Sequence, residues 1–347
     1  MQKVNYIYGR FEHHAQHSGY DQIVKYISGQ KVESRAILYI LNKLPQGLVR
    51  ILKQRAYKWW YHNENLATEL KIALLMIMKG KRLYHFLYGD KDYSLLRFFN
   101  GLRGNKILST YHQPPCILDQ CLISKGHLKH LNGIIAVANN QISYFKRYVE
   151  KERIFFVPHG VDINFFHPLD GSKEQGFKRC LSVGHWLRDF DVLREVIRIV
   201  NKKEKEIKFI IVTREEYFDI FRNLTNVELL CGISENELLT LYQTSDALLL
   251  PLKDATANNV LLEGASCGLP VVVTDVGGIR DYVDEACAVL IPQGKNQAEL
   301  MAEGLCKVLR DNNRRLGMSK MCRQRALEFN WEIVAGKMEE VYKQVLS

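Results

Sequence analysis

The chain has 347 residues, of which 47% are hydrophobic and 25% charged, and its formal net charge is +10. This length and apolar content support two domains with substantial cores. They exclude a membrane-spanning protein, because the longest plain apolar run, residues 72–78, is too short to cross a bilayer.

The charge is divided unevenly between the two halves. Residues 1–168 hold 24 Lys plus Arg against 11 Asp plus Glu, a net +13, and residues 169–347 hold 24 against 27, a net −3. We expect the amino-terminal half to meet an anionic surface or substrate. The eight cysteines show no close pair and no zinc-site spacing, and no signal peptide is visible after Met1. These features favour a reducing cytoplasm, with the protein soluble or peripheral on the inner face of a membrane.

Predicted strands and helices alternate from the start of the chain, which is typical of a parallel sheet wrapped by helices. A strand over Val4–Tyr8 leads into a loop over residues 9–19 that contains three histidines, and a helix is expected from about Tyr20. No Asp, Glu or Cys is spaced to complete a metal site with these histidines, so we interpret the segment as a loop that faces a ligand. Gly19 lets the backbone approach that ligand closely.

Residues 48–62 form a basic amphipathic segment. At helical spacing one face collects the apolar side chains Leu48, Val49, Leu52, Ala56, Trp59 and Trp60. A basic helix with tryptophans on its apolar side is typical of a membrane interface, especially an anionic one. The alternative is that this face packs on the amino-terminal sheet, and both interpretations stay open.

Further strands are predicted at residues 83–87, 106–110, 134–138 and 154–157. His112 follows the second of these, in a turn at the carboxyl end of a strand. It is a candidate to hydrogen-bond a sugar hydroxyl, although a lone histidine is more often structural. The Asn139–Gln141 segment reads as a helix cap.

The second half opens after a polar linker at residues 170–176. A strand at 180–184 leads to a loop containing Arg188, whose planar guanidinium suits phosphate oxygens, with a surface salt bridge as the alternative. Asp189-Phe190-Asp191 matches a D-x-D metal motif, but a helix cap is the better interpretation.

Strands at 208–213 and 227–230 precede Ser234 and Glu237, which are spaced as a capping box. The order then becomes strand at 247–250, polar turn at 254–259, helix at 260–265 and strand at 271–274. Such a loop at a strand's carboxyl end, followed by a helix amino terminus, suits a diphosphate.

This last stretch resembles the nucleotide-sugar segment of retaining glycosyltransferases with the GT-B fold, which carry an E-x7-E motif. Glu263, the turn at residues 267–270, the strand at 271–275 and Gly277-Gly278 match, whereas Ala255 stands where the family has its first glutamate. Residues 157–168 resemble the family's inter-domain segment. The resemblance implies two Rossmann-like domains facing across a cleft, at residues 1–168 and 169–330, with a helix at 331–347 crossing back to the first.

The resemblance also implies a function. It is the metal-independent transfer of a hexosyl-type sugar from a UDP- or GDP-linked donor to a saccharide, lipid-linked or other hydroxyl acceptor, without a cofactor or nucleic-acid partner. His185 stands where the family has an arginine that contacts the pyrophosphate, and Arg188 close by is the residue that can replace it. The predicted site residues are catalytic His112, Arg188 and Glu263, and donor-binding Gly19, Gly184, His185, Gly232, Ile233, Asn258, Asn259 and Val260.

Three other functional classes compete with this one. A catalytically weakened subunit that binds the donor is the main alternative, because Ala255 replaces a carboxylate. A nucleotide-sugar epimerase would bind the same donor. A nicotinamide dehydrogenase is disfavoured, because no G-x-G-x-x-G follows either domain's first strand.

Overall fold

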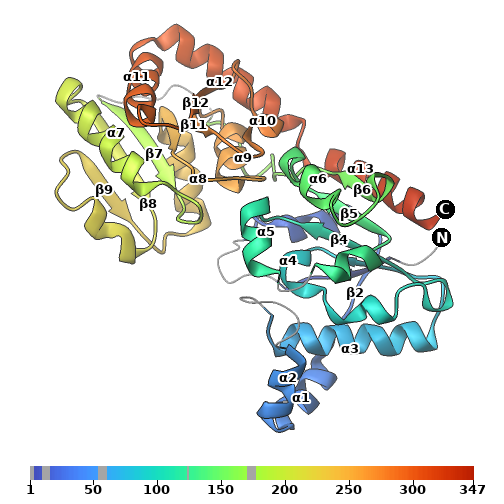
Figure 1. Ribbon diagram of the computed structural model, residues 1–347. Helices are drawn as coiled ribbons and strands as arrows, with labels where there is room; N and C mark the ends of the chain where they lie inside the picture. Colours follow the sequence, from blue (N-terminus) through green and yellow to red (C-terminus); the bar gives the residue numbers. More distant parts are fainter. Residues whose placement is uncertain (1–3, 10–15, 54–60, 123–124, 170–176) are drawn as a thin grey trace. The chain divides into compact units, whose positions relative to one another are not determined.

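The computed structural model describes residues 4–9, 16–53, 61–122, 125–169 and 177–347. These divide into two compact units (Figure 1). Unit 1 comprises the described parts of residues 1–13, 19–159 and 331–347, and unit 2 those of residues 14–18 and 160–330. Residues 160–168, expected at the end of the first domain, belong to unit 2, and the predicted linker at 170–176 lies outside the described residues.

Unit 1 is built on a parallel sheet of six short strands in the order β2-β1-β3-β4-β5-β6. Most of its strand residues are buried and apolar, as in a sheet covered on both faces. The strands are β1 (Val4–Ile7), β2 (Gln30–Lys31), β3 (Leu83–Phe86), β4 (Lys106–Tyr111), β5 (Gly133–Ala136) and β6 (Ile154–Phe156).

Seven α-helices are described in unit 1: α1 (Arg35–Lys43), α2 (Gln46–Lys53), α3 (Asn63–Met78), α4 (Gly89–Asp92), α5 (Pro115–Cys121), α6 (Asn139–Phe145) and α13 (Trp331–Leu346). The α-helix expected from Tyr20 is instead a short 3-10 helix, Tyr20–Lys25, in which the Gln22 N–H donates to the Gly19 carbonyl three residues back. Helix α13 is fixed to the sheet by a 2.8 Å hydrogen bond between the Tyr342 hydroxyl and His85 Nδ1.

The amphipathic segment at 48–62 differs in part from its prediction. Helix α2 covers residues 46–53, where Val49 is fully buried whereas Leu48, assigned to the same face, is exposed. Trp59 and Trp60 lie outside the described residues. Tyr61 is buried and non-helical, and its hydroxyl donates to Glu69. Within the described part of the chain, no helix is both long and apolar enough to cross a bilayer.

Unit 2 contains a second parallel sheet, in the order β12-β11-β10-β7-β8-β9. Its strands are β7 (Lys178–Val183), β8 (Ile207–Val212), β9 (Val227–Leu230), β10 (Ala247–Leu250), β11 (Val271–Asp275) and β12 (Ala288–Pro292). The chain builds outward from β7 through β8 and β9, then returns to β10 and builds in the other direction. This is the doubly wound order in which ligands bind between the two central strands, here β7 and β10.

Helices cover both faces of this sheet: α7 (Phe190–Lys203), α8 (Glu235–Thr244), α9 (Asn259–Ser266), α10 (Ile279–Tyr282), α11 (Gln297–Arg310) and α12 (Asn312–Leu327). Successive side chains of strand β10 point to opposite faces of the sheet. Leu248 and Leu250 join the apolar cluster under α9 and α12, whereas Leu249 joins the cluster under α7 and α11. The prediction of two Rossmann-like domains is confirmed.

Candidate functional site

Two loops meet at the carboxyl ends of β7 and β10. The Asp189 N–H donates to the Pro251 carbonyl and the Lys253 N–H to the Leu187 carbonyl, both at 2.9 Å. Arg188 and Leu252 form an antiparallel bridge between these bonds. The backbone therefore joins the two loops at the point where this sheet order places a ligand.

Arg188 lies inside this junction. Its Nε donates to the Val183 carbonyl at 2.9 Å and its Nη1 to the Trp186 carbonyl at 3.3 Å. The side chain is buried, and burial lowers the pKa of Arg188 to about 10, so the group stays charged at neutral pH. It forms no ion pair with any carboxylate of the described residues. The alternative prediction, that Arg188 forms a surface salt bridge, is therefore wrong.

Gly184 makes room for the Arg188 guanidinium. Its φ of 92° is in the left-handed region, and a Cβ there would lie 3.1 Å from Arg188 Nη2. His185 is partly buried, and burial is the main cause that lowers its pKa, so its ring is neutral at pH 7. Asp189 accepts from the Val192 N–H at 3.2 Å, which confirms the helix cap predicted for the D-x-D sequence.

The loop after β10 runs into the amino terminus of α9. The Asn258 side chain caps this helix by accepting from the Leu261 N–H at 3.2 Å, and Asn259 and Val260 form the first turn. Ala255, which stands where the family has its first glutamate, is buried in an apolar cluster. Its carbonyl accepts from the Gly278 N–H at 3.0 Å.

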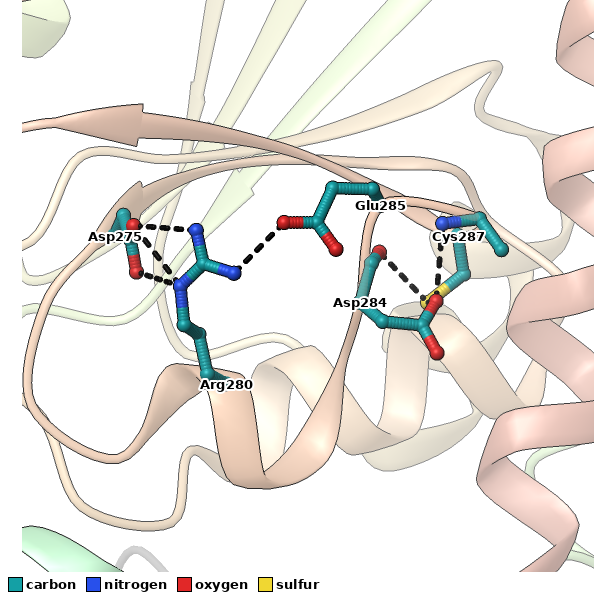
Figure 2. Close-up of polar contacts among 6 residues, drawn as sticks. Asp275, Arg280, Asp284, Glu285 and Cys287 are labelled. Carbon is teal, nitrogen blue, oxygen red and sulfur yellow. Dashed lines mark hydrogen bonds and ion pairs between the residues drawn. The ribbon is translucent and has the colours of Figure 1, made fainter.

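The turn after β11 is braced by charged side chains (Figure 2). Arg280 Nη2 donates to Asp275 at 2.8 Å and Nη1 donates to Glu285 at 2.7 Å. Gly277, with a φ of 59°, stands so close to the loop after β10 that a Cβ there would lie 2.0 Å from the Ala255 carbonyl oxygen. The Gly-Gly turn thus fits against the residue that replaces the first glutamate.

Glu263 on α9 is buried and held at both oxygens. The Tyr242 hydroxyl donates to Oε2 at 2.9 Å and the Ser18 hydroxyl to Oε1 at 2.7 Å. Burial is the main cause that raises the pKa of Glu263. Sequence reasoning missed both hydroxyl partners, since Ser18 stands 245 residues away and nothing local marks it.

The segment that carries Ser18 is tied to unit 2 by His17. The His17 N–H donates to Glu235 at 2.8 Å, its Nδ1 lies 2.7 Å from an Asp162 oxygen, and its ring stacks on Phe165 at 3.9 Å. Of the three loop histidines, His17 thus has a structural role. His13 and His14 lie outside the described residues.

The turn at Gly232-Ile233 precedes α8. Gly232 has a φ of 63°, and the capping box predicted for Ser234 and Glu237 is confirmed by reciprocal bonds of 3.2 Å and 2.7 Å. No group of three or more His, Cys, Asp or Glu within the described ranges is arranged to hold a metal ion.

His112 belongs to unit 1 and is fixed from two sides. Its N–H donates to the Asp90 carboxylate at 2.9 Å, as does that of Gln113 at 3.1 Å. Its Nε2 lies 2.7 Å from the Leu87 carbonyl and must donate, because that oxygen only accepts. Asp90 was not anticipated from the sequence, and burial raises its pKa to about 6.

Gly19 also belongs to unit 1, with a φ of 99° that favours glycine. The next residue, Tyr20, is fully buried, and its ring meets those of His112, His159 and Trp331 edge-on at 4.7, 5.3 and 5.8 Å. Gly19 therefore directly precedes the tyrosine that packs on His112, while the remaining predicted site residues lie in unit 2.

Residues 178–311, most of unit 2, match the family "Glycosyl transferases group 1". Solved structures match across both units: sucrose-phosphate synthase from Thermosynechococcus elongatus has a TM-score of 0.67 and 16% identity over 99% of both chains. The chain therefore has the GT-B fold. Another GT-B match is Anabaena HepE in complex with UDP and glucose, with a TM-score of 0.70 and 13% identity over 99% of this chain and 100% of that one.

Curated relatives resemble the chain over a shorter region. D-inositol 3-phosphate glycosyltransferase from Corynebacterium urealyticum is 30% identical over 109 residues, which is 31% of this chain and 26% of the relative. The match thus spans about a quarter of the length of that relative.

Proposed function

We propose that the chain is a retaining glycosyltransferase that moves a sugar from a nucleotide diphosphate donor to a hydroxyl acceptor. The observation that carries this proposal is the arrangement at the β7–β10 switch point. There a buried guanidinium without a carboxylate partner among the described residues accompanies the amino terminus of α9, and α9 also carries the buried Glu263.

Each polar group of the site in unit 2 has a proposed partner on the nucleotide-sugar donor. Arg188 and the first-turn N–H groups at Asn259 and Val260 complement the negative diphosphate. Glu263 accepts from ribose hydroxyls, since a carboxylate has about four lone-pair sites and its two hydroxyl partners use two. The turn at residues 232–233 contacts the nucleotide base of the donor. The UDP bound by the Anabaena relative supports a UDP-linked donor, with GDP as the second choice.

The proposed reaction breaks the bond between the sugar's anomeric carbon and a phosphate oxygen. The acceptor oxygen forms the new bond on the same face, and its proton passes to the departing phosphate. Negative charge grows on that phosphate, so Arg188 and the α9 amides stabilise the transition state more than the ground state. No metal and no further cofactor take part in this proposal.

His112 and Gly19 remain predicted donor contacts of unit 1, and the acceptor is a saccharide, a lipid-linked saccharide or another hydroxyl compound. The +13 charge of residues 1–168 favours an anionic acceptor or surface. Contact with an anionic membrane through residues 48–62, on its cytoplasmic face, belongs to the same proposal.

A thermal-shift screen with UDP-, GDP- and ADP-sugars tests the donor, because a ligand that binds only the folded chain raises its melting temperature. Donor hydrolysis and sugar transfer are then measured with the stabilising donor. We expect Glu263→Gln to lower kcat/KM roughly 10- to 100-fold, the loss typical of hydrogen bonds to a charged group. Glu299→Ala, at an exposed position on α11, is the control and should be unchanged. A wild type that binds a donor without any turnover would favour a donor-binding subunit instead.

A further inference from the structure

The α1–α2 hairpin presents large apolar side chains to solvent. Figure 1 shows both helices beyond α3, on its far side from the strands of unit 1. The exposed fractions are Tyr39 63%, Ile40 57%, Leu44 38%, Leu48 53% and Ile51 60%. Single exposed apolar residues are ordinary on protein surfaces, but four on two consecutive short helices, with Leu44 in the turn between them, need an explanation.

The opposite side of the hairpin is anchored in unit 1. Leu41 and Val49 are buried in the apolar core around α3. The Lys53 ammonium donates to Asn63 at 2.7 Å, and Asn63 donates to Asn42 at 2.9 Å, which ties α2 and α1 to the start of α3. The exposed side chains therefore lie on the outer surface of helices whose inner side is already buried.

Positive charge surrounds this apolar face. Residues 34–63 contain no Asp or Glu at all, and the described helices carry Arg35, Lys43, Arg50 and Lys53. Lys43 Nζ stands 4.3 Å from the centre of the Tyr39 ring, so cation and aromatic share one patch. Apolar and basic side chains are thus mixed on one surface, and the acidic neighbour Glu33, just before α1, pairs with Arg35 at 3.2 Å.

We infer that the α1–α2 hairpin is a membrane-interface element that docks unit 1 on an anionic bilayer. At nine and eight residues the helices are too short to span a membrane, but they suit a position in its plane. A second copy of this chain fits less well, because self-association through this face would bring two sets of basic residues together. The face differs from the one predicted for residues 48–62, since it excludes Val49 and includes α1.

Docking on a bilayer also narrows the range of acceptors. A transferase docked on a bilayer works on acceptors held at the lipid surface, so a lipid-linked hydroxyl acceptor is favoured over a free saccharide. That last step rests on the proposed function, whereas the docking itself does not.

Vesicle flotation of the full chain tests the docking. Vesicles of phosphatidylcholine alone are compared with vesicles that also contain phosphatidylglycerol. We expect binding to the anionic vesicles only, weakened by added salt. The triple substitution Ile40→Asp, Leu48→Asp and Ile51→Asp should lower the partition at least about tenfold, because it removes apolar burial and adds like charge to the anionic surface. Arg50→Gln should lower it about fivefold.

The matched control is Leu316→Asp, an exposed leucine on α12 of unit 2 that should leave flotation unchanged. Circular dichroism confirms that each variant folds. Absence of flotation, or flotation that the triple substitution does not change, would overturn the inference. So would a dimer seen by light scattering that this substitution disrupts, since the face would then be covered by a second copy.

Donor binding is measured on the same preparations. The triple variant should keep the donor-induced thermal shift of the wild type. If flotation fails while the shift persists, only the membrane inference falls. If no donor binds while flotation persists, the proposed function falls and the membrane surface stands.

Discussion

The two sheets share a parallel design, yet a basic group is buried near the strand ends of one and acidic groups near those of the other. Unit 2 buries the Arg188 guanidinium against backbone carbonyls, whereas unit 1 buries Asp90 and Asp92 in α4, next to the loop that follows β4. Burying a charged group without a partner of opposite charge costs free energy. The sign of that charge therefore indicates the kind of ligand that would neutralise it. The same fold therefore carries the proposed anion site in one unit and a rigid loop scaffold in the other.

The unit 1 carboxylates show how that scaffold is held. Asp90 accepts the N–H groups of His112 and Gln113, and Asp92 accepts from Asn65 Nδ2 at 2.5 Å. Burial is the largest cause in both cases and raises the pKa of Asp90 to about 6 and that of Asp92 to about 7. These acids are committed to backbone and amide donors, which organises the His112 loop.

Removing the buried cation should have the largest effect. We expect Arg188→Ala to lower kcat/KM at least about 100-fold, since the lost donor faces charge that develops in the transition state. Isothermal titration should show weaker binding of UDP and unchanged binding of uridine, which lacks the phosphates. Arg194→Ala, an exposed arginine on α7, is the control. Unchanged UDP affinity in Arg188→Ala would show that the switch point of unit 2 is not an anion site.

Neutralising a buried acid of unit 1 should change how stability depends on pH. The folded pKa of Asp92, about 7, lies above its ordinary value of 3.8. Between these values the folded chain binds more protons than the unfolded chain, so this group's contribution to stability falls as pH rises. Relative to wild type, Asp92→Asn should therefore gain on the order of 4 kcal/mol of unfolding free energy between about pH 4 and about pH 8.

Urea unfolding of both proteins across this range measures that difference. The variant is compared with wild type because His85 also makes the stability of both proteins depend on pH. Burial lowers the pKa of His85 to about 3, so its contribution to stability rises with pH up to its unfolded value near 6.5. A profile for Asp92→Asn that runs parallel to wild type would mean that Asp92 is ionised in the folded chain throughout this range.

A smaller effect is expected from the hydroxyls on Glu263. Ser18→Ala should raise the KM for the donor about three- to tenfold, because one of the two bonds that orient this carboxylate is lost. Tyr242→Phe should act alike. Thr240→Ala is the control on the same helix, since that hydroxyl donates only to the carbonyl of Asn236 within α8. A fall in KM for Ser18→Ala would show that its hydroxyl competes with the donor rather than orienting Glu263.

The sequence predicted those features whose causes are local. Buried strands such as residues 247–250, the capping box at Ser234 and the cap at Asp189 all follow from short-range patterns, and the structure confirms them. Partners distant in sequence were missed, namely Ser18 and Tyr242 on Glu263 and Asp90 under His112. Only the sheet order brings those residues together.

Helix faces near the surface were also misjudged. The 100° periodicity placed Leu48 and Val49 on one side, but adjacent residues differ by a quarter of a turn or more, and the core reaches only Val49. Which neighbours a helix meets decides which part of a broad apolar face is buried. That information lies in the packing of α2 near α3 and not in α2 itself.

The smallest effect is expected at Arg280, an exposed charged group near the site. Its bonds to Asp275 and Glu285 have good geometry, but its side chain is 56% exposed, so solvent screens them. Arg280→Ala should leave the donor KM within about twofold of wild type and the melting temperature nearly unchanged. The turn keeps its place because the Gly278 N–H still donates to the Ala255 carbonyl. A large loss in either measurement would show that the side-chain bridge, and not this backbone bond, positions the turn beside the donor loop.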